Sequence, residues 1–337
     1  MKKFFLLVPV AALAMTACTS ESTESVGAAQ QPKEISFNAL AQNPTRAAVQ
    51  GTTFPTTNSM EIVAYQSAPA TAANYFEQTT FSYSTSVWKG SKYWPLSPAT
   101  LNFYAVSAAG VSSSHISINS ALTNATVAYT TGNSYSATTQ SDIMYAFNRG
   151  VVTQSTNTLS FNSGNPVPLV FNHTQAQVRF QIKAADATSC AIQINNITLN
   201  GAKYNGELTL TPTAAVTATT GAVTSTVAWS NVSDPVATQA VPNITDYTLT
   251  QSYYPADDAA NDACASLLII PGTGNGYTGF TINYTLNGKS YSYTYSDTHA
   301  DTTVSTVYSY KISMQLHEIE VSATVTDWTP SNTDVTL

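Results

Sequence analysis

Apolar and polar residues alternate over many short runs of this sequence, and turn-forming Ser, Asn, Gly and Pro separate the runs. Such alternation predicts β-strands with one buried face, because successive side chains of a strand point to opposite sides of the sheet. No stretch shows the spacing of a long amphipathic helix. Short strands with such turns favour an all-β sandwich or barrel. The predicted strands are residues 35–39, 61–65, 99–107, 115–118, 125–129, 167–171, 178–184, 192–199, 207–210, 267–270, 280–286, 290–295, 308–316 and 319–325.

The length of 337 residues predicts two domains, since a domain takes about 100–200 residues. Turn residues cluster over 162–167, with the sequence Asn-Ser-Gly-Asn-Pro-Val, and predict the boundary. We therefore expect an N-terminal domain over 47–165 and a C-terminal domain over 166–337. Thr, Ala and Val dominate residues 211–240, where we expect a long loop with weak strands.

Charge is scarce: 9% of residues are charged, the net charge is −7, and Lys and Arg together number 12. A nucleic-acid-binding surface needs clustered basic side chains to neutralise phosphates, so this function class is excluded. Hydrophobic residues make up 43% of the chain, which is enough for a sizeable core. A neutral, Thr- and Tyr-rich composition of this kind is typical of a β-rich protein of the cell surface.

The N-terminus has the features of an export signal. Lys2 and Lys3 precede a short apolar segment that ends at Met15, too short to span a bilayer. Small residues then lead to Cys18, as at the processing site of a bacterial lipoprotein. We expect a signal peptide over 1–17 and acylation of Cys18, which would anchor the chain to the outer membrane. The alternative is an ordinary secretory peptide followed by an incidental cysteine.

Cys190 and Cys264 are the cysteines outside the signal region, and each precedes an apolar strand pattern. Export makes a disulfide between them feasible. The alternative is that both are small buried hydrophobic residues. The sequence leaves this choice open.

No motif of this chain supports an enzyme or a cofactor. The four His residues are widely separated, and no zinc-ligand spacing appears among His and Cys. Residues 274–279 match the dinucleotide fingerprint Gly-x-Gly-x-x-Gly, but a strand and not a helix is predicted to follow, which favours a turn. Asp257, Asp258 and Asp262 lack the spacing of an EF-hand calcium loop, so a solvated loop is favoured.

Two further groups of residues have a structural and a functional interpretation. Trp88, Tyr93 and Trp94 are suited to stacking against a sugar, but aromatic residues in strands more often pack in the core. His173 follows the apolar run 168–171, where a hydrogen-bonded structural histidine is more common than a site residue. The structural interpretation is preferred for both groups.

Several short patterns, taken together and in this order, resemble the fimbrillins, the subunits of the protease-assembled pili of anaerobic Gram-negative bacteria. The resemblance covers nearly the whole chain, and no single pattern decides it. The patterns are the lipoprotein signal, Thr45-Arg46-Ala47, Trp88, Tyr93-Trp94-Pro95, Leu101–Ala105, Asp142–Ala146, Val167–His173, Gly206-Glu207-Leu208, Leu267–Pro271 and Val325–Trp328.

The resemblance implies two transthyretin-like β-sandwich domains and a lipidated propeptide over 18–46. An arginine-specific protease would cut between Arg46 and Ala47 and release the first strand. The displaced side chains would be Ile35, Phe37 and Ala39. A C-terminal strand of another subunit, near 325–337, would fill the groove left behind. The implied donor side chains are Val325, Trp328, Val335 and Leu337.

Three arginines compete as cleavage sites, and Arg46 follows a strand and a proline in a polar segment. Arg179 alternates within a predicted strand, where a protease has no access, whereas Arg149 beside Gly150 is the competing accessible site. The expected partners are other pilus subunits and a host receptor or glycan, and no cofactor or metal is expected. Two alternatives stay open: a surface lipoprotein that binds glycans, and a membrane-held anchor subunit of the pilus.

Overall fold

The structure is a computed structural model. It describes residues 31–41, 54–68, 73–108, 116–118, 125–129, 142–156, 158–185, 191–212, 225–233, 238–240, 244–255, 264–315 and 319–327. Within these ranges the secondary structure is β-strand, apart from one short 3-10 turn, η3, at Asn162–Gly164. The prediction of an all-β protein is therefore confirmed.

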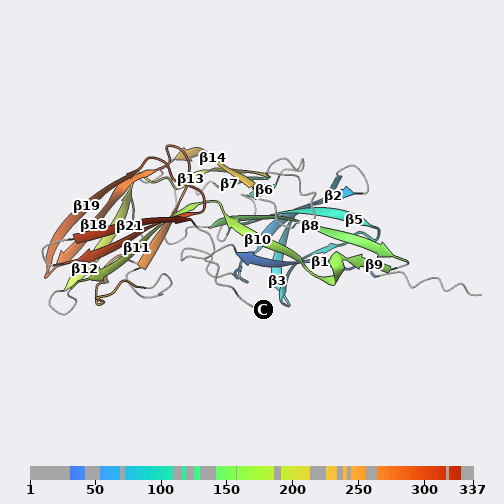
Figure 1. Ribbon diagram of the computed structural model, residues 1–337, viewed down its shortest axis with the longest axis horizontal. Coiled ribbons are helices and arrows are strands. Elements are labelled where there is room, and N and C mark those ends of the chain that lie inside the picture. Colours follow the sequence, from blue (N-terminus) through green and yellow to red (C-terminus); the bar gives the residue numbers. More distant parts are fainter. Residues whose placement is uncertain are drawn as a thin grey trace, which may run out of the picture. The chain divides into compact units, whose positions relative to one another are not determined.

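The strands of the first half belong mostly to an eight-stranded sheet with the order β10-β1-β4-β3-β2-β5-β8-β9. Strand β10 also pairs with β8, so the strand order closes on itself around an apolar core. Figure 1 shows β10 between β1 and β8. The bounds are β1 Glu34–Ala41, β2 Met60–Ala68, β3 Ala73–Ser84, β4 Val87–Tyr93, β5 Ala99–Ala108, β8 Ile143–Ser155, β9 Thr158–Phe161 and β10 Val167–His173.

The second half contains two sheets that face each other. One has four strands in the order β17-β11-β20-β21, and the other has the order β15-β12-β18-β19, with β16 paired to β12. The bounds are β11 Ala176–Ala184, β12 Ile192–Asn200, β15 Thr238–Ala240, β16 Tyr247–Thr248, β17 Cys264–Ile269, β18 Tyr277–Leu286, β19 Lys289–His299, β20 Thr306–Met314 and β21 Ile319–Asp327.

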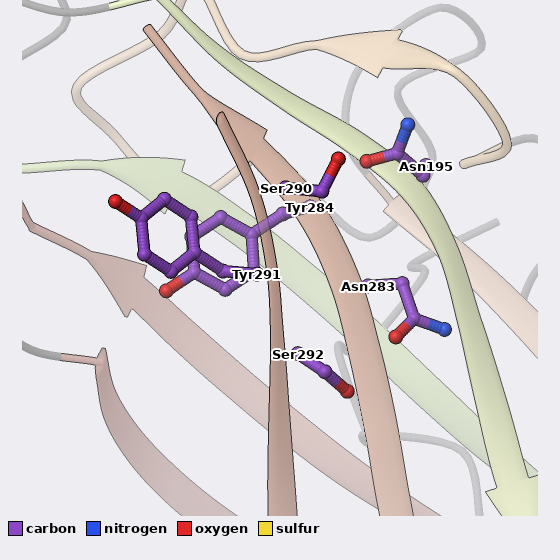
Figure 2. Close-up of a pocket in the computed structure, with 6 residues that line it drawn as sticks. All are labelled: Asn195, Asn283, Tyr284, Ser290, Tyr291 and Ser292. Atoms are coloured by element: carbon purple, nitrogen blue, oxygen red, sulfur yellow. The ribbon is translucent and has the colours of Figure 1, made fainter. Parts of the chain in front are cut away.

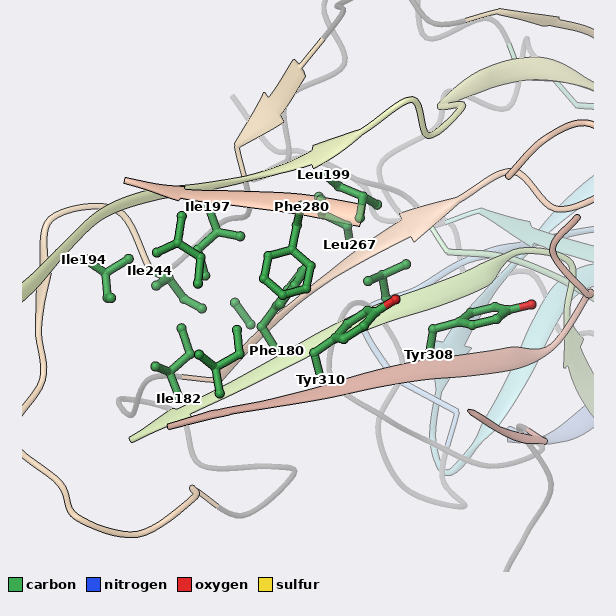
Figure 3. Close-up of a cluster of buried hydrophobic side chains, with 14 of the residues drawn as sticks. Phe180, Ile182, Ile194, Ile197, Leu199, Ile244, Leu267, Phe280, Tyr308 and Tyr310 are labelled. Atoms are coloured by element: carbon green, nitrogen blue, oxygen red, sulfur yellow. The ribbon is translucent and has the colours of Figure 1, made fainter. Parts of the chain in front are cut away.

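Side chains from both of these sheets meet in one buried cluster (Figure 3). The ring of Phe180 on β11 lies 5.0 Å from that of Phe280 on β18, edge to face. The ring of Tyr310 on β20 stacks on Phe180 and also contacts Phe280. Alternate residues of each strand supply this core, which is the arrangement expected of a sandwich.

A fourth sheet, with the order β14-β13-β7-β6, combines strands from both sides of the predicted boundary at 165/166. Its bounds are β6 Ile116–Ile118, β7 Ala125–Tyr129, β13 Asn205–Pro212 and β14 Ser225–Ser233. Leu208 and Leu210 of β13 pack against a cluster of β2, β5 and β8 side chains that includes Tyr104 and Phe147. Strand β10 likewise follows the predicted boundary and pairs with β1 and β8. The division into 47–165 and 166–337, and the transthyretin-like type of each part, stay predictions.

Within 211–240, where a loop with weak strands was expected, β14 is a nine-residue strand paired with β13. The glycine-rich residues 274–279 lead into β18, so the predicted strand over 280–286 is confirmed. Gly276 and Gly279 let β18 approach the chain at β19 closely. A Cβ atom at Gly276 would lie 1.5 Å from the carbonyl oxygen of His299, and one at Gly279 would lie 2.0 Å from that of Tyr295.

Candidate functional site

Strand β1 lies inside a sheet and not at its edge. It pairs in parallel with β10, where Phe37 lies opposite Val167 and Ala41 opposite Phe171. On its other side it pairs antiparallel with β4, where Phe37 lies opposite Trp88. The predicted strand over 35–39 is thus confirmed as a strand, and removing it would leave the facing edges of β4 and β10 without their partner.

The inward side chains of β1 fill the core of the first half. Ile35, Phe37, Ala39 and Ala41 are all buried, and they alternate with exposed or half-buried residues. The ring of Phe37 makes edge-to-face contacts with Phe81 and Phe103, at centroid distances of 5.1 and 5.0 Å. The first two of these inward positions hold large side chains, and the last two hold alanines.

The outward side of β1 makes polar contacts at its start. The carboxylate of Glu34 lies 3.7 Å from Nζ of Lys89 and accepts a hydrogen bond of 3.1 Å from the backbone N–H of Ser91. Ser91 has a positive φ of 54°, and the register shifts here between Glu34 and Ser36, so the carboxylate sits at a bulge. The carbonyl oxygen of Lys33 accepts a further bond from the N–H of Trp94.

The chain after β1 is described again from Phe54, whose ring stacks on Phe171 at 4.4 Å and contacts Trp88 at 5.6 Å. Arg46 and Ala47, the predicted cleavage site, lie between these two anchored points and outside the described residues, as does Cys18.

The other two arginines lie within strands. Arg179 is buried in β11, as predicted. Arg149, expected to be the accessible competitor, lies inside β8 opposite Asn102 of β5 and is half-buried. Ladder hydrogen bonds on such a strand oppose the extended, unpaired backbone that a protease needs.

The C-terminal strand β21 is an edge strand that pairs with β20 along its whole length. Val325 lies opposite Tyr308 in this ladder, and its side chain is 53% exposed. The other predicted donor residues, Trp328, Val335 and Leu337, lie outside the described residues. Val321 is partly buried against the core of the second half.

Trp88 and Trp94 are buried, and they pack against Phe54 and Phe103 respectively. Tyr93 is half exposed. The preferred interpretation, core packing, is therefore confirmed for the two tryptophans, and the three rings form no common platform.

His173, at the end of β10, is buried and lies within hydrogen-bond distance of Asp142. The interpretation as a structural histidine is confirmed.

A shallow depression of about 390 Å³ lies over β18 and β19, lined by Asn195, Asn283, Tyr284, Ser290, Tyr291 and Ser292 (Figure 2). Asn283 faces Ser292 across the ladder, and the rings of Tyr284 and Tyr291 stack at 5.5 Å. Asn283 already donates to Asn196, and Thr285 to Asn195. The amides are thus used within the sheet, and we assign no function to this depression.

Among the described residues, no three His, Cys, Asp or Glu side chains gather in a way that could hold a metal ion. Asp257, Asp258, Asp262 and Cys190 lie outside these residues, as does the side chain of Cys264. The disulfide therefore stays a prediction. No helix long and apolar enough to cross a membrane occurs in the part of the chain that the structure describes.

The sequence profile of the fimbrillin-like proteins matches residues 45–328. The chain belongs to the fimbrillin-like family. This family consists of structural subunits of fimbriae, so the chain is a fimbrillin-like protein. The resemblance read from the short motifs is thereby confirmed. No curated protein matches the chain at a significant level.

Solved structures of low sequence identity resemble this fimbrillin-like chain. A candidate cell adhesion protein of Bacteroides uniformis has 15% identity and a TM-score of 0.46, with 88% of this chain and 99% of that chain covered. A fimbrial protein of Bacteroides vulgatus has 13% identity and a TM-score of 0.45, with 87% and 99% covered. The tip fimbrial protein Mfa3 of Porphyromonas gingivalis, truncated at its C-terminus, has 10% identity and a TM-score of 0.43, with 88% and 100% covered.

The sequence patterns did not identify three residues that belong to β1 or contact it. Ala41 continues the alternation of Ile35, Phe37 and Ala39 and could have been found by extending that pattern. Lys89 and Ser91 hold Glu34, but they carry no sequence signal, because only the pairing of β1 with β4 brings them to it.

Proposed function

We propose that this chain is the exported precursor of a pilus subunit and that it polymerises by exchanging β1 for a strand of another subunit. The observation that carries the proposal is the position of β1: an eight-residue strand inside the sheet, with four inward side chains in the core, at the N-terminal end of the folded part. The segment that joins it to Phe54 contains Arg46.

Loss of β1 would create a binding site for another strand. The edges of β4 and β10 would present unpaired N–H and C=O groups, and the places of Ile35 and Phe37 would become an apolar groove. Such an edge pairs readily with an added strand. If that strand comes from the C-terminal part of a neighbour, the contact is head to tail and does not close, so it grows a filament.

Cleavage after Arg46 would free β1 from the rest of the chain without cutting any described strand. The profile match begins at residue 45, so β1 lies ahead of the part of the chain that the family shares. Before cleavage, the lipid on Cys18 would hold the precursor at the outer membrane. After cleavage, the subunit would keep only residues from Ala47 onward.

The test is Arg46→Lys. This variant keeps the positive charge at residue 46, but an arginine-specific protease no longer recognises the bond that follows it. We expect a folded, surface-held precursor that retains β1 and enters no filaments. Arg149→Lys is the matched control, and it should be processed and assembled normally. N-terminal sequencing of material sheared from cells reads out the cut, and electron microscopy reads out the filaments. Normal filaments from Arg46→Lys would contradict the proposal.

The same experiment distinguishes the proposed function from both alternatives. A glycan-binding lipoprotein and a pilus anchor would both keep β1 and the lipid, so the unmodified chain itself would start before residue 47 when recovered from the surface.

Deleting 330–337 tests the donor role: the shortened subunit should be cut and should accept a strand, but should not extend a filament.

A further inference from the structure

Four residues near the C-terminus repeat the chemistry of the start of β1. Asp334-Val335-Thr336-Leu337 matches Glu34-Ile35-Ser36-Phe37 position by position. Each tetrapeptide has an acid, a β-branched apolar residue, a hydroxyl residue and a large apolar residue, in that order and in the same chain direction. In β1 these are the residues that pair with β4.

Each of the four residue types has a defined position or contact in β1. The acid at position 34 receives Lys89 and the N–H of Ser91 at the bulge. The apolar residues at 35 and 37 point inward, and the second one lies between Phe81 and Phe103. Ser36 faces outward, opposite Lys89. When β1 leaves, Lys89 and the N–H of Ser91 both lose their contact with the Glu34 carboxylate.

We propose that Asp334–Leu337 of a second copy enters this groove in the direction and register of Glu34–Phe37, with the Asp334 carboxylate held by Lys89 and the N–H of Ser91. This inference rests on the proposed function, because it requires that β1 leaves and that a C-terminal segment replaces it. It adds which residues align and which contact selects the register. Asp is one methylene shorter than Glu, and for the ion pair the long, flexible side chain of Lys89 closes this difference.

A competing match exists in β21. Glu320-Val321-Ser322 repeats the first three classes, but Ala323 follows, and an alanine would leave the space between Phe81 and Phe103 empty. Residues 319–327 are also hydrogen-bonded to β20 along their whole length, and leaving that ladder would forfeit its bonds. The segment 334–337 has Leu337, a large apolar residue, at the fourth position.

The opposite strand direction satisfies the polar contact less well. If Leu337 took the place of Ile35 with the strand reversed, Val335 would still fill the place of Phe37. Asp334 would then lie at the position of Asn38, opposite Pro168 of β10 and away from Lys89. The carboxylate therefore distinguishes the two directions, although the apolar residues do not.

The contact can be tested by a double-mutant cycle. Full-length chain cut after Arg46 is titrated with a fluorescent synthetic peptide of residues 328–337. We expect Asp334→Asn in the peptide, or Lys89→Met in the chain, to weaken binding by about two- to fivefold, as for a partly exposed ion pair. The two changes together should cost no more than either alone, and added salt should shrink the effect. Lys289→Met, an equal charge change at the exposed start of β19, is the control.

The direction is tested in filaments by cross-linking. Glu34 lies opposite Tyr93 of β4, so Asp334→Cys should form an inter-subunit disulfide with Tyr93→Cys, and mass spectrometry should identify the linked peptide. A link to Pro168→Cys instead, or binding without coupling between Asp334 and Lys89, would overturn this inference and leave strand exchange standing. If the peptide does not bind and no cross-link forms, the proposed donor role itself is wrong.

Discussion

Nδ1 of His173 lies 3.0 and 2.9 Å from the two carboxylate oxygens of Asp142, and both side chains are about 1% exposed. Asp142 precedes β8 and His173 ends β10, so the pair joins the two strands where the ring of strands closes. The neighbouring Thr174 adds a hydroxyl bond of 2.8 Å to the carbonyl oxygen of Ile143, and Gln175 accepts the N–H of Ile143.

This buried pair predicts a large loss of stability when one partner is removed. We expect Asp142→Leu to lower the free energy of unfolding by about 1–3 kcal/mol, because buried His173 would lose its hydrogen bond to Asp142. Urea denaturation followed by tryptophan fluorescence measures the loss. Asp246→Asn, a change on an exposed turn residue with positive φ, should change stability by less than about 0.5 kcal/mol. An equally small effect of Asp142→Leu would show that the pair adds nothing.

Alanine substitutions on the two faces of β1 should differ in how much stability they cost. Phe37→Ala should destabilise the uncut chain by about 3–5 kcal/mol, because it removes a buried ring that contacts Phe81 and Phe103. Leu40→Ala, on the same strand but with its side chain 49% exposed, should cost less than about 1 kcal/mol. Urea midpoints of the two variants make the comparison. If β1 leaves after cleavage, the subunit that remains will have the same stability whether it came from either variant or from the unmodified chain.

Buried tyrosines predict a loss of stability in alkali. Burial, reinforced by the nearby charge of ionised Tyr65, raises the pKa of Tyr104 from 10.0 to about 12. Burial also raises the pKa values of Tyr277 and Tyr310, which share a hydrogen bond of 2.7 Å. A raised pKa means that the folded state holds the proton more tightly. The stabilisation is therefore complete below pH 10 and is lost as the pH rises towards 12.

Each such tyrosine should lower the free energy of unfolding by about 1.4 kcal/mol for each pH unit above its ordinary pKa of 10.0, up to its raised pKa. Tyr104→Phe should make the slope of stability against pH shallower, because it removes the group whose pKa burial raises. Denaturant titrations between pH 9 and 11 measure the slopes. Equal slopes for Tyr104→Phe and the unmodified chain would contradict this assignment.

Acylation of Cys18 predicts a separate phenotype at the membrane. Cys18→Ser should incorporate no labelled palmitate and should not partition with outer membranes, because the thiol that receives the lipid is gone. Cys264→Ser is the matched control and should incorporate label normally. Full labelling of Cys18→Ser would show that the N-terminal region is an ordinary secretory signal.

Local patterns determined much of this protein. Alternation over 35–39, 280–286 and 319–325 was sufficient to place β1, β18 and β21 as strands. In β1, every second side chain is also buried. The family was likewise readable from short motifs in a fixed order, and the profile match over 45–328 confirms it. Strands β3 and β4 were not predicted, because most of their side chains are exposed or half-buried.

Only the tertiary structure decided which strands become neighbours. No local signal says that β1 lies between β4 and β10, that Glu34 meets Lys89 and Ser91, or that β13 pairs with β7 across about 80 residues of sequence. Register between distant strands depends on the fit of whole faces, such as Phe37 between Phe81 and Phe103, and not on either strand alone. The sequence by itself determined that residues 34–41 are a strand with a buried face, and the packing of the complete fold determined what that strand covers.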